Sequence, residues 1–158
     1  PFLTASGDLS HHLSEVPRYF TATPVPGRPS RLRVSSGSVW EPIAGYSRAV
    51  RVGDVIRVSG TTATDGSSRQ VAPGDPAAQA TYILDKIAAS IAALGWTIED
   101  VVRTRVYLRD AQQWEAVSRA HGRMFGEVLP ANTLLEVGSL IGEYDVEIEA
   151  EAILSAAR

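Results

Sequence analysis

The side chains that could do chemistry in this sequence are few in kind. The 158 residues include no cysteine, 3 histidines and a single lysine, Lys86. Without cysteine the chain has no disulfide, no thiolate nucleophile and no cysteine metal ligand. A Schiff-base mechanism would depend on Lys86 alone. These residues are too few for most metalloenzymes and for a Ser-His-Asp hydrolase, so we expect no metal and no cofactor.

Acidic residues alternate with apolar ones near the C-terminus. Residues 145–152 read DVEIEAEA, which places Glu147, Glu149 and Glu151 on one face of a strand and apolar side chains on the other. Glu147 could act as a general base or orient a water molecule. It could equally be one rung of an acidic face that pairs with Arg103 or Arg105 on another strand. The residues alone leave both readings open.

The histidines give little support to a ligand set. His121 lies on the apolar stripe of a predicted helix, where we expect a hydrogen-bonded structural histidine. His11 and His12, together with Glu15, resemble a metal site only loosely.

Hydrophobic periodicity predicts the elements that must position these residues. Asp75 and Pro76 are typical of an N-cap and first helical residue, and Gly95 of a helix end. The predicted strands cover residues 45–53, 54–63, 101–110, 131–140 and 145–154, and the predicted helices cover 75–95 and 110–129. The second helix should bury one stripe: Trp114, Val117, His121, Met124 and Val128. The order β-β-α-β-α-β-β indicates an α+β fold with both helices on one face of a mixed sheet.

The predicted strand 101–110 alternates as well. Val102, Thr104, Val106 and Leu108 should face the helices, opposite Arg103, Arg105, Tyr107 and Arg109. The second face thus carries arginines on one strand and glutamates on another. Because both helices should cover the first face of the sheet, we expect the second face to be buried against another subunit.

The N-terminal residues differ from the rest. Residues 1–37 are rich in Pro, Ser and Gly and show no strand or helix period, so we predict an extension followed by one domain at 38–158. The net charge of −3 and pI of about 5.6 give no basic field for nucleic acid. No apolar run is long enough for a membrane span and no signal peptide is visible, so a cytoplasmic location is expected.

Four short segments occur in order along the chain: GYSRAV at 45–50, VSGT at 58–61, PANT at 130–133 and VEIEA at 146–150. In this order, and at close to this spacing, they resemble the Rid family, whose older name is YjgF. The resemblance covers residues 38–158. It implies a chorismate-mutase-like fold and a homotrimer with three clefts between subunits, in which the family's deaminases hydrolyse enamines and imines.

The resemblance also implies a set of site residues. In those deaminases a glutamate orders the attacking water, and a tyrosine and a Ser-Gly backbone line the pocket. The tyrosine falls on Tyr46 and the glutamate on Glu147. The Ser-Gly pair falls on Ser59 and Gly60, with Thr61 directly after it.

The chain departs from the family at the residue that grips the substrate carboxylate. That arginine position is Asn132, and the pocket position two residues later, often cysteine, is Leu134. Arginine offers a carboxylate two parallel charged hydrogen bonds, whereas asparagine offers neutral dipoles. Generic 2-imino acids are therefore unexpected substrates. Arg48 or Arg105 could supply the missing positive charge, or both could only neutralise the strand glutamates.

Two classes of function remain. The first is a trimer that binds a small metabolite and acts on it as a deaminase or related hydrolase of an enamine, imine or lactam-like compound. The second is a non-catalytic metabolite-binding or partner-binding trimer. Endoribonuclease activity, suggested by an older family name, is disfavoured by the acidic pI and the lack of a basic groove.

Overall fold

The computed structural model describes residues 20–154. The elements are β1 (Thr21–Val25), β2 (Arg28–Ser35), α2 (Trp40–Ala44), β3 (Ala49–Val52), β4 (Val55–Thr61), α3 (Pro76–Ala93), η2 (Ile98–Asp100), β5 (Val101–Leu108), η3 (Ala111–Gln113), α4 (Trp114–Phe125), β6 (Ala131–Glu136) and β7 (Val146–Ile153). The strands form one sheet in the order β1-β2-β3-β4-β7-β5-β6. Strands β5 and β6 are parallel and the other pairs antiparallel, so the sheet is mixed.

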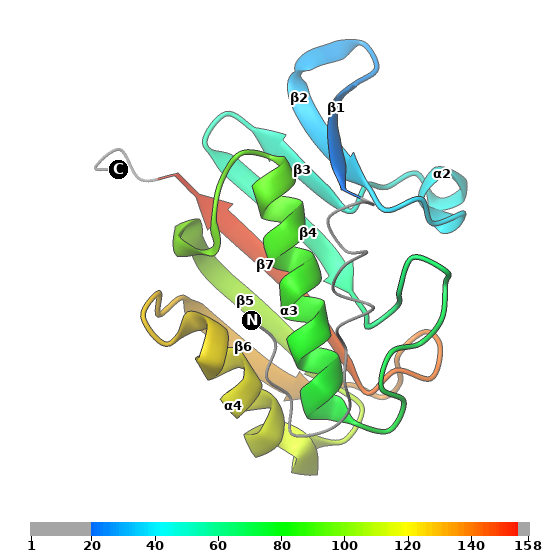
Figure 1. The fold of residues 1–158 in the computed structure, drawn as a ribbon, viewed down its shortest axis with the longest axis vertical. Coiled ribbons are helices and arrows are strands. Elements are labelled where there is room, and N and C mark those ends of the chain that lie inside the picture. The colour runs from blue at the N-terminus through cyan, green and yellow to red at the C-terminus, as the bar shows by residue number, and fades with distance from the viewer. Residues whose placement is uncertain (1–19, 155–158) are drawn as a thin grey trace.

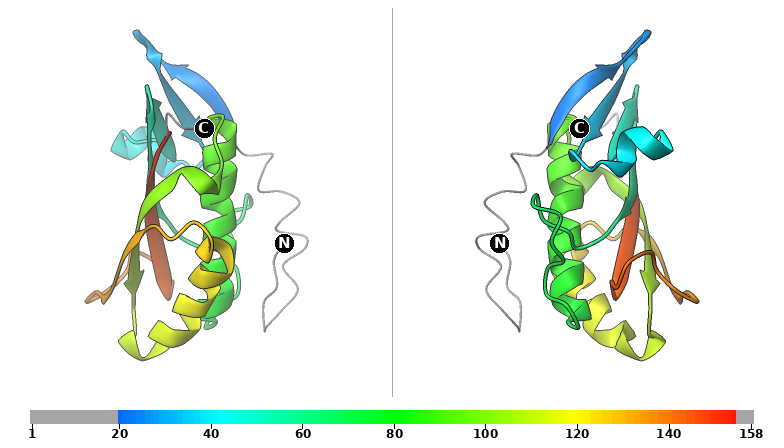
Figure 2. Two further views of the ribbon diagram at one scale, coloured as in Figure 1. Left: turned by 90° about the vertical axis from the view of Figure 1, so that its left-hand side faces the viewer. Right: turned by 90° about the vertical axis from the view of Figure 1, so that its right-hand side faces the viewer.

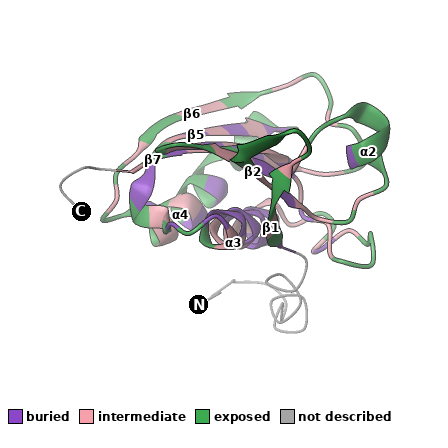
Figure 3. Cartoon of the chain, turned by 90° about the horizontal axis from the view of Figure 1, so that it is seen from above, coloured by how far each residue is buried: buried purple, intermediate pink, exposed green. Residues whose placement is uncertain are grey.

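Helices α3 and α4 lie side by side on one face of the sheet, which confirms the predicted α+β architecture (Figures 1 and 2). Helix α3 is largely buried, whereas β1, β6 and α2 are mostly exposed (Figure 3). We call the other side of the sheet, which neither α3 nor α4 covers, the open face.

The start and end of α3 follow the sequence signals. The Asp75 carboxylate accepts a hydrogen bond from the backbone N–H of Ala78 at 3.0 Å, and Pro76 occupies the first helical turn. Beyond the helix, Gly95 has φ of 96°, a conformation that favours glycine. Both predicted boundaries are confirmed.

Helix α4 differs from its prediction at the first turn. Asp110 caps the 3₁₀ turn η3 by accepting from Gln112 N–H at 2.9 Å, and the α-helix begins only at Trp114. Trp114 is 54% exposed, so its placement on the buried stripe was wrong. It lies one turn before Val117, where packing against the core begins.

Strand β7 is as predicted, with its four apolar residues buried: Val146, Ile148, Ala150 and Ala152. Strand β5 has one irregularity, because the register with β7 shifts between Val101 and Arg103. Val101 therefore occupies the buried position, and Val102, predicted to face the helices, is 41% exposed.

The N-terminal stretch contains strands that the sequence did not predict. Strands β1 and β2 form a hairpin around Gly27, whose φ is 75°, and β2 pairs with β3 at the edge of the sheet. Most of their side chains are exposed on both faces, so no apolar period marks them. Val34, which is fully buried, anchors β2 to the core.

Candidate functional site on the open face

Ser59 and Gly60 lie in an irregular pairing between β4 and β7. Val58 pairs with Ala150, but the next recorded pair is Thr61 with Ile148. Two residues of β4 therefore stand opposite one residue of β7, which is a β-bulge. Bulges re-aim side chains next to functional sites, and this one brings the Gly60 backbone under a side chain of β7.

That side chain is Glu147. A Cβ atom added to Gly60 would lie 2.1 Å from Glu147 Oε2, so the carboxylate occupies the space that any other residue at position 60 would fill. Burial raises the pKa of the Glu147 carboxyl; the charge of Arg48 opposes this rise and Glu149 adds to it. The arrangement suits a carboxylate that accepts and returns a proton during a reaction.

Arg48 lies behind this carboxylate. It is only 8% exposed, and its Nη2 donates a hydrogen bond to the Gly60 carbonyl at 2.6 Å. Its guanidinium carbon lies 5.8 Å from the centre of the Tyr46 ring. Burial lowers the Arg48 pKa, while Tyr46, Glu41 and Glu147 oppose the shift. Arg48 therefore holds the bulge and places positive charge near Glu147.

A cavity of about 370 Å³ opens beside Glu147. Its lining residues are Gly60, Tyr107, Val137, Ser139, Leu140, Ile141, Glu147 and Glu149. Two carboxylates and no basic side chain line it, so a single subunit offers an acidic rather than an anion-binding surface.

The hydroxyl groups of the predicted Ser-Gly-Thr segment are used within the chain. Ser59 Oγ donates to the Ser47 carbonyl at 2.6 Å, and Thr61 Oγ1 donates to the Ser59 carbonyl at 2.8 Å. Thr61 is buried and does not line the cavity. Of this segment, only Gly60 lines the cavity.

Arg105 is paired with the strand glutamates. Its Nη1 lies 3.0 Å from Glu151 Oε2 and 4.0 Å from Glu149 Oε1. Tyr107 Oη donates a short hydrogen bond to Glu149 Oε1. These contacts favour the neutralising role that the sequence left open, and a ligand-binding role for Arg105 stays a prediction.

Asn132 and Leu134 lie on the other face of the sheet. Asn132 Nδ2 donates to Thr104 Oγ1 at 3.0 Å, and Thr104 Oγ1 lies 2.8 Å from His121 Nε2. Leu134 packs against the core. The structure thus brings together Tyr46, Arg48, Ser59, Gly60 and Glu147, whereas within one chain it separates Asn132 and Leu134 from them. The prediction of a hydrogen-bonded His121 is confirmed.

Glu41 was not among the predicted site residues, although it lies just before the predicted strand 45–53, close enough in sequence to reach the mouth of a cleft. Glu41 is buried and accepts hydrogen bonds from Ser35 Oγ at 2.8 Å and from the Ser36 backbone N–H at 3.2 Å. It is one of the charges that oppose the shift of the Arg48 pKa. Glu41 thus ties the end of β2 to the start of α2, next to Arg48.

Lys86 is buried too, and its Nζ donates to the carbonyls of Thr62 at 3.0 Å and Thr64 at 2.9 Å. Burial lowers its pKa to about 7, with a further contribution from Arg48. The sequence could have indicated this burial, because Lys86 lies three residues after Ile83 and so on the apolar stripe of α3.

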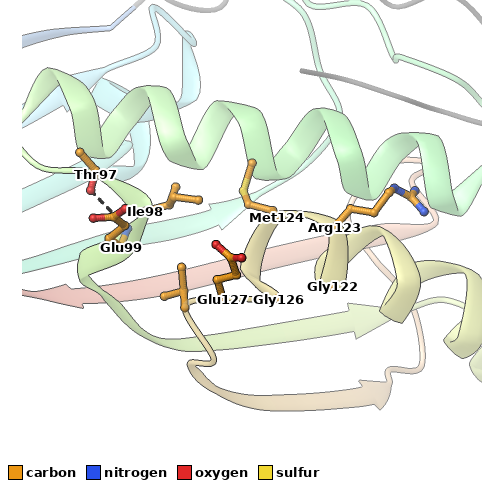
Figure 4. A pocket seen from close by; sticks show the side chains of 9 residues that line it. Thr97, Ile98, Glu99, Gly122, Arg123, Met124, Gly126 and Glu127 are labelled. Atoms are coloured by element: carbon orange, nitrogen blue, oxygen red, sulfur yellow. Dashed lines mark hydrogen bonds between the residues drawn. The ribbon is translucent and has the colours of Figure 1, made fainter.

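A second cavity, of about 840 Å³, lies between η2 and the C-terminal half of α4 (Figure 4). It contains none of the predicted site residues, and Glu99, Arg123 and Glu127 lie around it. Within residues 20–154 no three His, Cys, Asp or Glu side chains group as a metal site, and no helix there is long and apolar enough to cross a membrane. His11, His12 and Glu15 lie outside the described residues.

Comparison with known proteins decides the family. The family model described as endoribonuclease L-PSP matches residues 37–154. The chain belongs to the Rid (YjgF-like) family. An uncharacterized Streptomyces coelicolor protein, SCO2049, is 42% identical over 125 residues, covering 78% of this chain and 92% of that protein.

Two further Rid-family relatives bear on the site. The 2-iminobutanoate/2-iminopropanoate deaminase of Escherichia coli is 32% identical over 114 residues, covering 70% of this chain and 88% of the relative. The crystal structure of Rv2704 from Mycobacterium tuberculosis, a member of the YjgF/YER057c/UK114 family, is similar with a TM-score of 0.71 and 42% identity, over 79% of this chain and 100% of that one. Both the recognition of the family and the predicted fold are confirmed.

Proposed function

We propose that this Rid-family chain forms a homotrimer whose clefts between subunits bind a small metabolite and hydrolyse an imine or enamine in it. The observation that carries the proposal is the position of the Glu147 carboxylate, which lies over Gly60 and beside an open cavity. The pKa of this carboxyl is raised by burial. The deaminase activity for which the Escherichia coli relative is named supports the reaction class.

Glu147 can serve both halves of such a reaction. As a base it takes a proton from water while the water oxygen bonds to the iminium carbon and the C=N π electrons move to nitrogen. The protonated carboxyl then returns this proton to the nitrogen of the carbinolamine. The C–N bond breaks, and the hydroxyl proton leaves with the ammonia, so that the products are a carbonyl compound and ammonium. Because burial raises the pKa of Glu147, its carboxyl holds the proton more readily between the two transfers.

A second subunit is proposed because one chain leaves the site incomplete. Glu147 lies on the open face, and Asn132 and Leu134 lie on the helix side of β6, the edge strand. They can share one cleft only if β6 of one subunit approaches the open face of its neighbour. The open face also carries exposed apolar residues such as Leu135, which such contact would bury.

The metabolite is proposed to differ from the usual 2-imino acids. Asn132 replaces the arginine that would hold a carboxylate, and a charged hydrogen bond contributes about 1.5–3 kcal/mol. Within the cavity of a single subunit, Glu147 and Glu149 add negative charge. We expect slow turnover of short 2-imino acids generated in a coupled assay, and rates as fast as those of the family's deaminases would contradict this part of the proposal.

The central experiment compares Glu147→Gln with the matched control Glu115→Gln, whose carboxylate pairs with exposed Arg119 on α4. Ammonia release is measured for imines generated in situ from a panel of amines and amino acids. Loss of turnover in Glu147→Gln alone supports hydrolysis, and equal turnover in both variants contradicts it. Light scattering should give about three times 16.9 kDa, and a stable monomer would remove the intersubunit cleft.

A second candidate is a non-catalytic binding trimer. It is favoured by the missing arginine and by the hydroxyl groups of Ser59 and Thr61, which are hydrogen-bonded within the chain. Binding that depends on Glu147, without turnover of any compound in the panel, would select it. Endoribonuclease activity is the weakest candidate, because His121, the one histidine within residues 20–154, is bonded to Thr104.

A further inference from the structure

The side chain of Asn132 is held in a defined orientation by a hydrogen-bonded chain that begins in the core. Thr104 is fully buried, and its hydroxyl lies between Asn132 Nδ2 at 3.0 Å and His121 Nε2 at 2.8 Å. The Thr104 hydroxyl has one proton and two lone pairs, so it accepts from Asn132 and either donates to His121 Nε2 or accepts from it, according to the imidazole tautomer. Burial lowers the pKa of His121, which favours the neutral imidazole.

The hydrogen bond to Thr104 determines which polar groups of Asn132 are left for a ligand. A side-chain amide has two N–H donors and a carbonyl acceptor, and one N–H is committed to Thr104. Within residues 20–154 the Asn132 side chain makes no other hydrogen bond, and the residue is exposed. One N–H and the Oδ1 oxygen remain, so this position presents an acceptor as well as a donor.

We infer that Asn132, positioned by Thr104 and His121, makes the cleft specific for an uncharged amide-like group, such as a primary amide or lactam, in place of a carboxylate. Such a group carries both an acceptor and an N–H donor and so complements the two free groups of Asn132. A carboxylate can only accept, so it would face Oδ1 as well as the negative charges of Glu147 and Glu149. The inference rests on the proposed cleft between subunits, because Asn132 must meet the Glu147 of a neighbour.

The test uses two probes that differ only at the group in question, 2-oxobutanamide and 2-oxobutanoate. Both are titrated into the full chain at pH 7.5, and the side-chain NH₂ signals of Asn132 are followed by ¹⁵N NMR. The wild type should bind the amide ~10-fold more tightly, because the carboxylate has no N–H to donate to Asn132 Oδ1 and leaves that acceptor unpaired in the cleft. Asn132→Arg should reverse the order of the two probes.

Positioning is tested separately from packing. Thr104→Val removes the hydroxyl at nearly constant volume and should bring the ratio of the two affinities close to one, whereas Thr104→Ser should keep the ratio. Thr81→Val on α3, whose hydroxyl donates to the Ala77 carbonyl, is the matched control and should leave the ratio unchanged. A merely structural Thr104 would lower stability without changing the ratio.

Equal or tighter binding of the carboxylate by the wild type overturns the inference, as does the absence of binding by either probe at millimolar concentration. Glu147→Gln separates this failure from failure of the proposed function. If the carboxylate binds more tightly and Glu147→Gln changes its affinity, the cleft stands and only the specificity assigned to Asn132 falls. A chain that is monomeric in light scattering removes both.

Discussion

Gly60→Ala tests whether the bulge positions Glu147. The new methyl group would lie 2.1 Å from Oε2 and 3.1 Å from the carboxyl carbon of Glu147, so the carboxylate must move by more than 1 Å to regain ordinary contact at about 3.4 Å. A misplacement of about 1 Å at a reacting group costs on the order of 100-fold in rate. We therefore expect any hydrolysis that depends on Glu147 to fall by about that factor.

The same substitution should barely change stability. The colliding atoms belong to the end of a flexible side chain, and moving it off its rotamer costs roughly 0.5–1.5 kcal/mol. Replacing glycine in a strand by alanine returns about 0.5–1 kcal/mol of backbone entropy. The net change lies within about 1 kcal/mol, which is a shift in Tm of at most ~4 °C for a chain of this length.

The most direct assay is independent of substrate. Glu147 carries a raised pKa because it is buried, so a carboxylate pushed into the open cavity should titrate closer to its ordinary value. ¹³C NMR of the glutamate carboxyl groups measures this in wild type and in Gly60→Ala. Gly122→Ala, where a Cβ meets nothing within 4 Å, is the control. An unchanged Glu147 pKa together with unchanged turnover in Gly60→Ala would refute the positioning role.

Three further outcomes are expected. Burial lowers the Lys86 pKa to about 7, so between pH 7 and about 10 the unfolded chain binds a proton that the folded chain does not. The free energy of unfolding of the wild type should therefore rise with pH over this range. Lys86→Met should flatten the rise in urea denaturation at pH 7 and 9.5, and a steeper rise in the variant would contradict the reasoning. Glu147 has a raised pKa in the folded chain, so its contribution to stability is complete below its unfolded pKa and is lost as pH rises through its folded pKa. Above the folded pKa, Glu147→Gln should be more stable than the wild type, and it should not lose stability between the two pKa values. Thermal unfolding at a series of pH values measures both. Val117→Ala should cost about 2 kcal/mol, two methyl groups plus a cavity, while Trp114→Ala costs much less because Trp114 is largely exposed; equal losses by urea denaturation would show that α4 packs differently.

The sequence by itself determined the elements that have one buried face. The alternation in β7, the apolar spacing in α3 and the Asp75 cap are local patterns, and the structure matches each of them. The resemblance also identified Glu147 and Gly60, which prove to lie against each other. These results follow because burial of one face and capping of one end are determined by residues close in the chain.

Only the tertiary structure decided what depends on pairing between distant segments. The hairpin β1–β2 exists because β2 adds to the edge of β3, and its own residues carry no apolar period. The bulge at Ser59 and Gly60 is a mismatch in register with β7, which neither strand shows alone. Asn132 is held by Thr104 and His121, 28 and 11 residues away, and its role as donor or acceptor follows from that chain. Hydrogen bonds across a fold are set by which atoms meet, and a one-dimensional pattern does not contain that information.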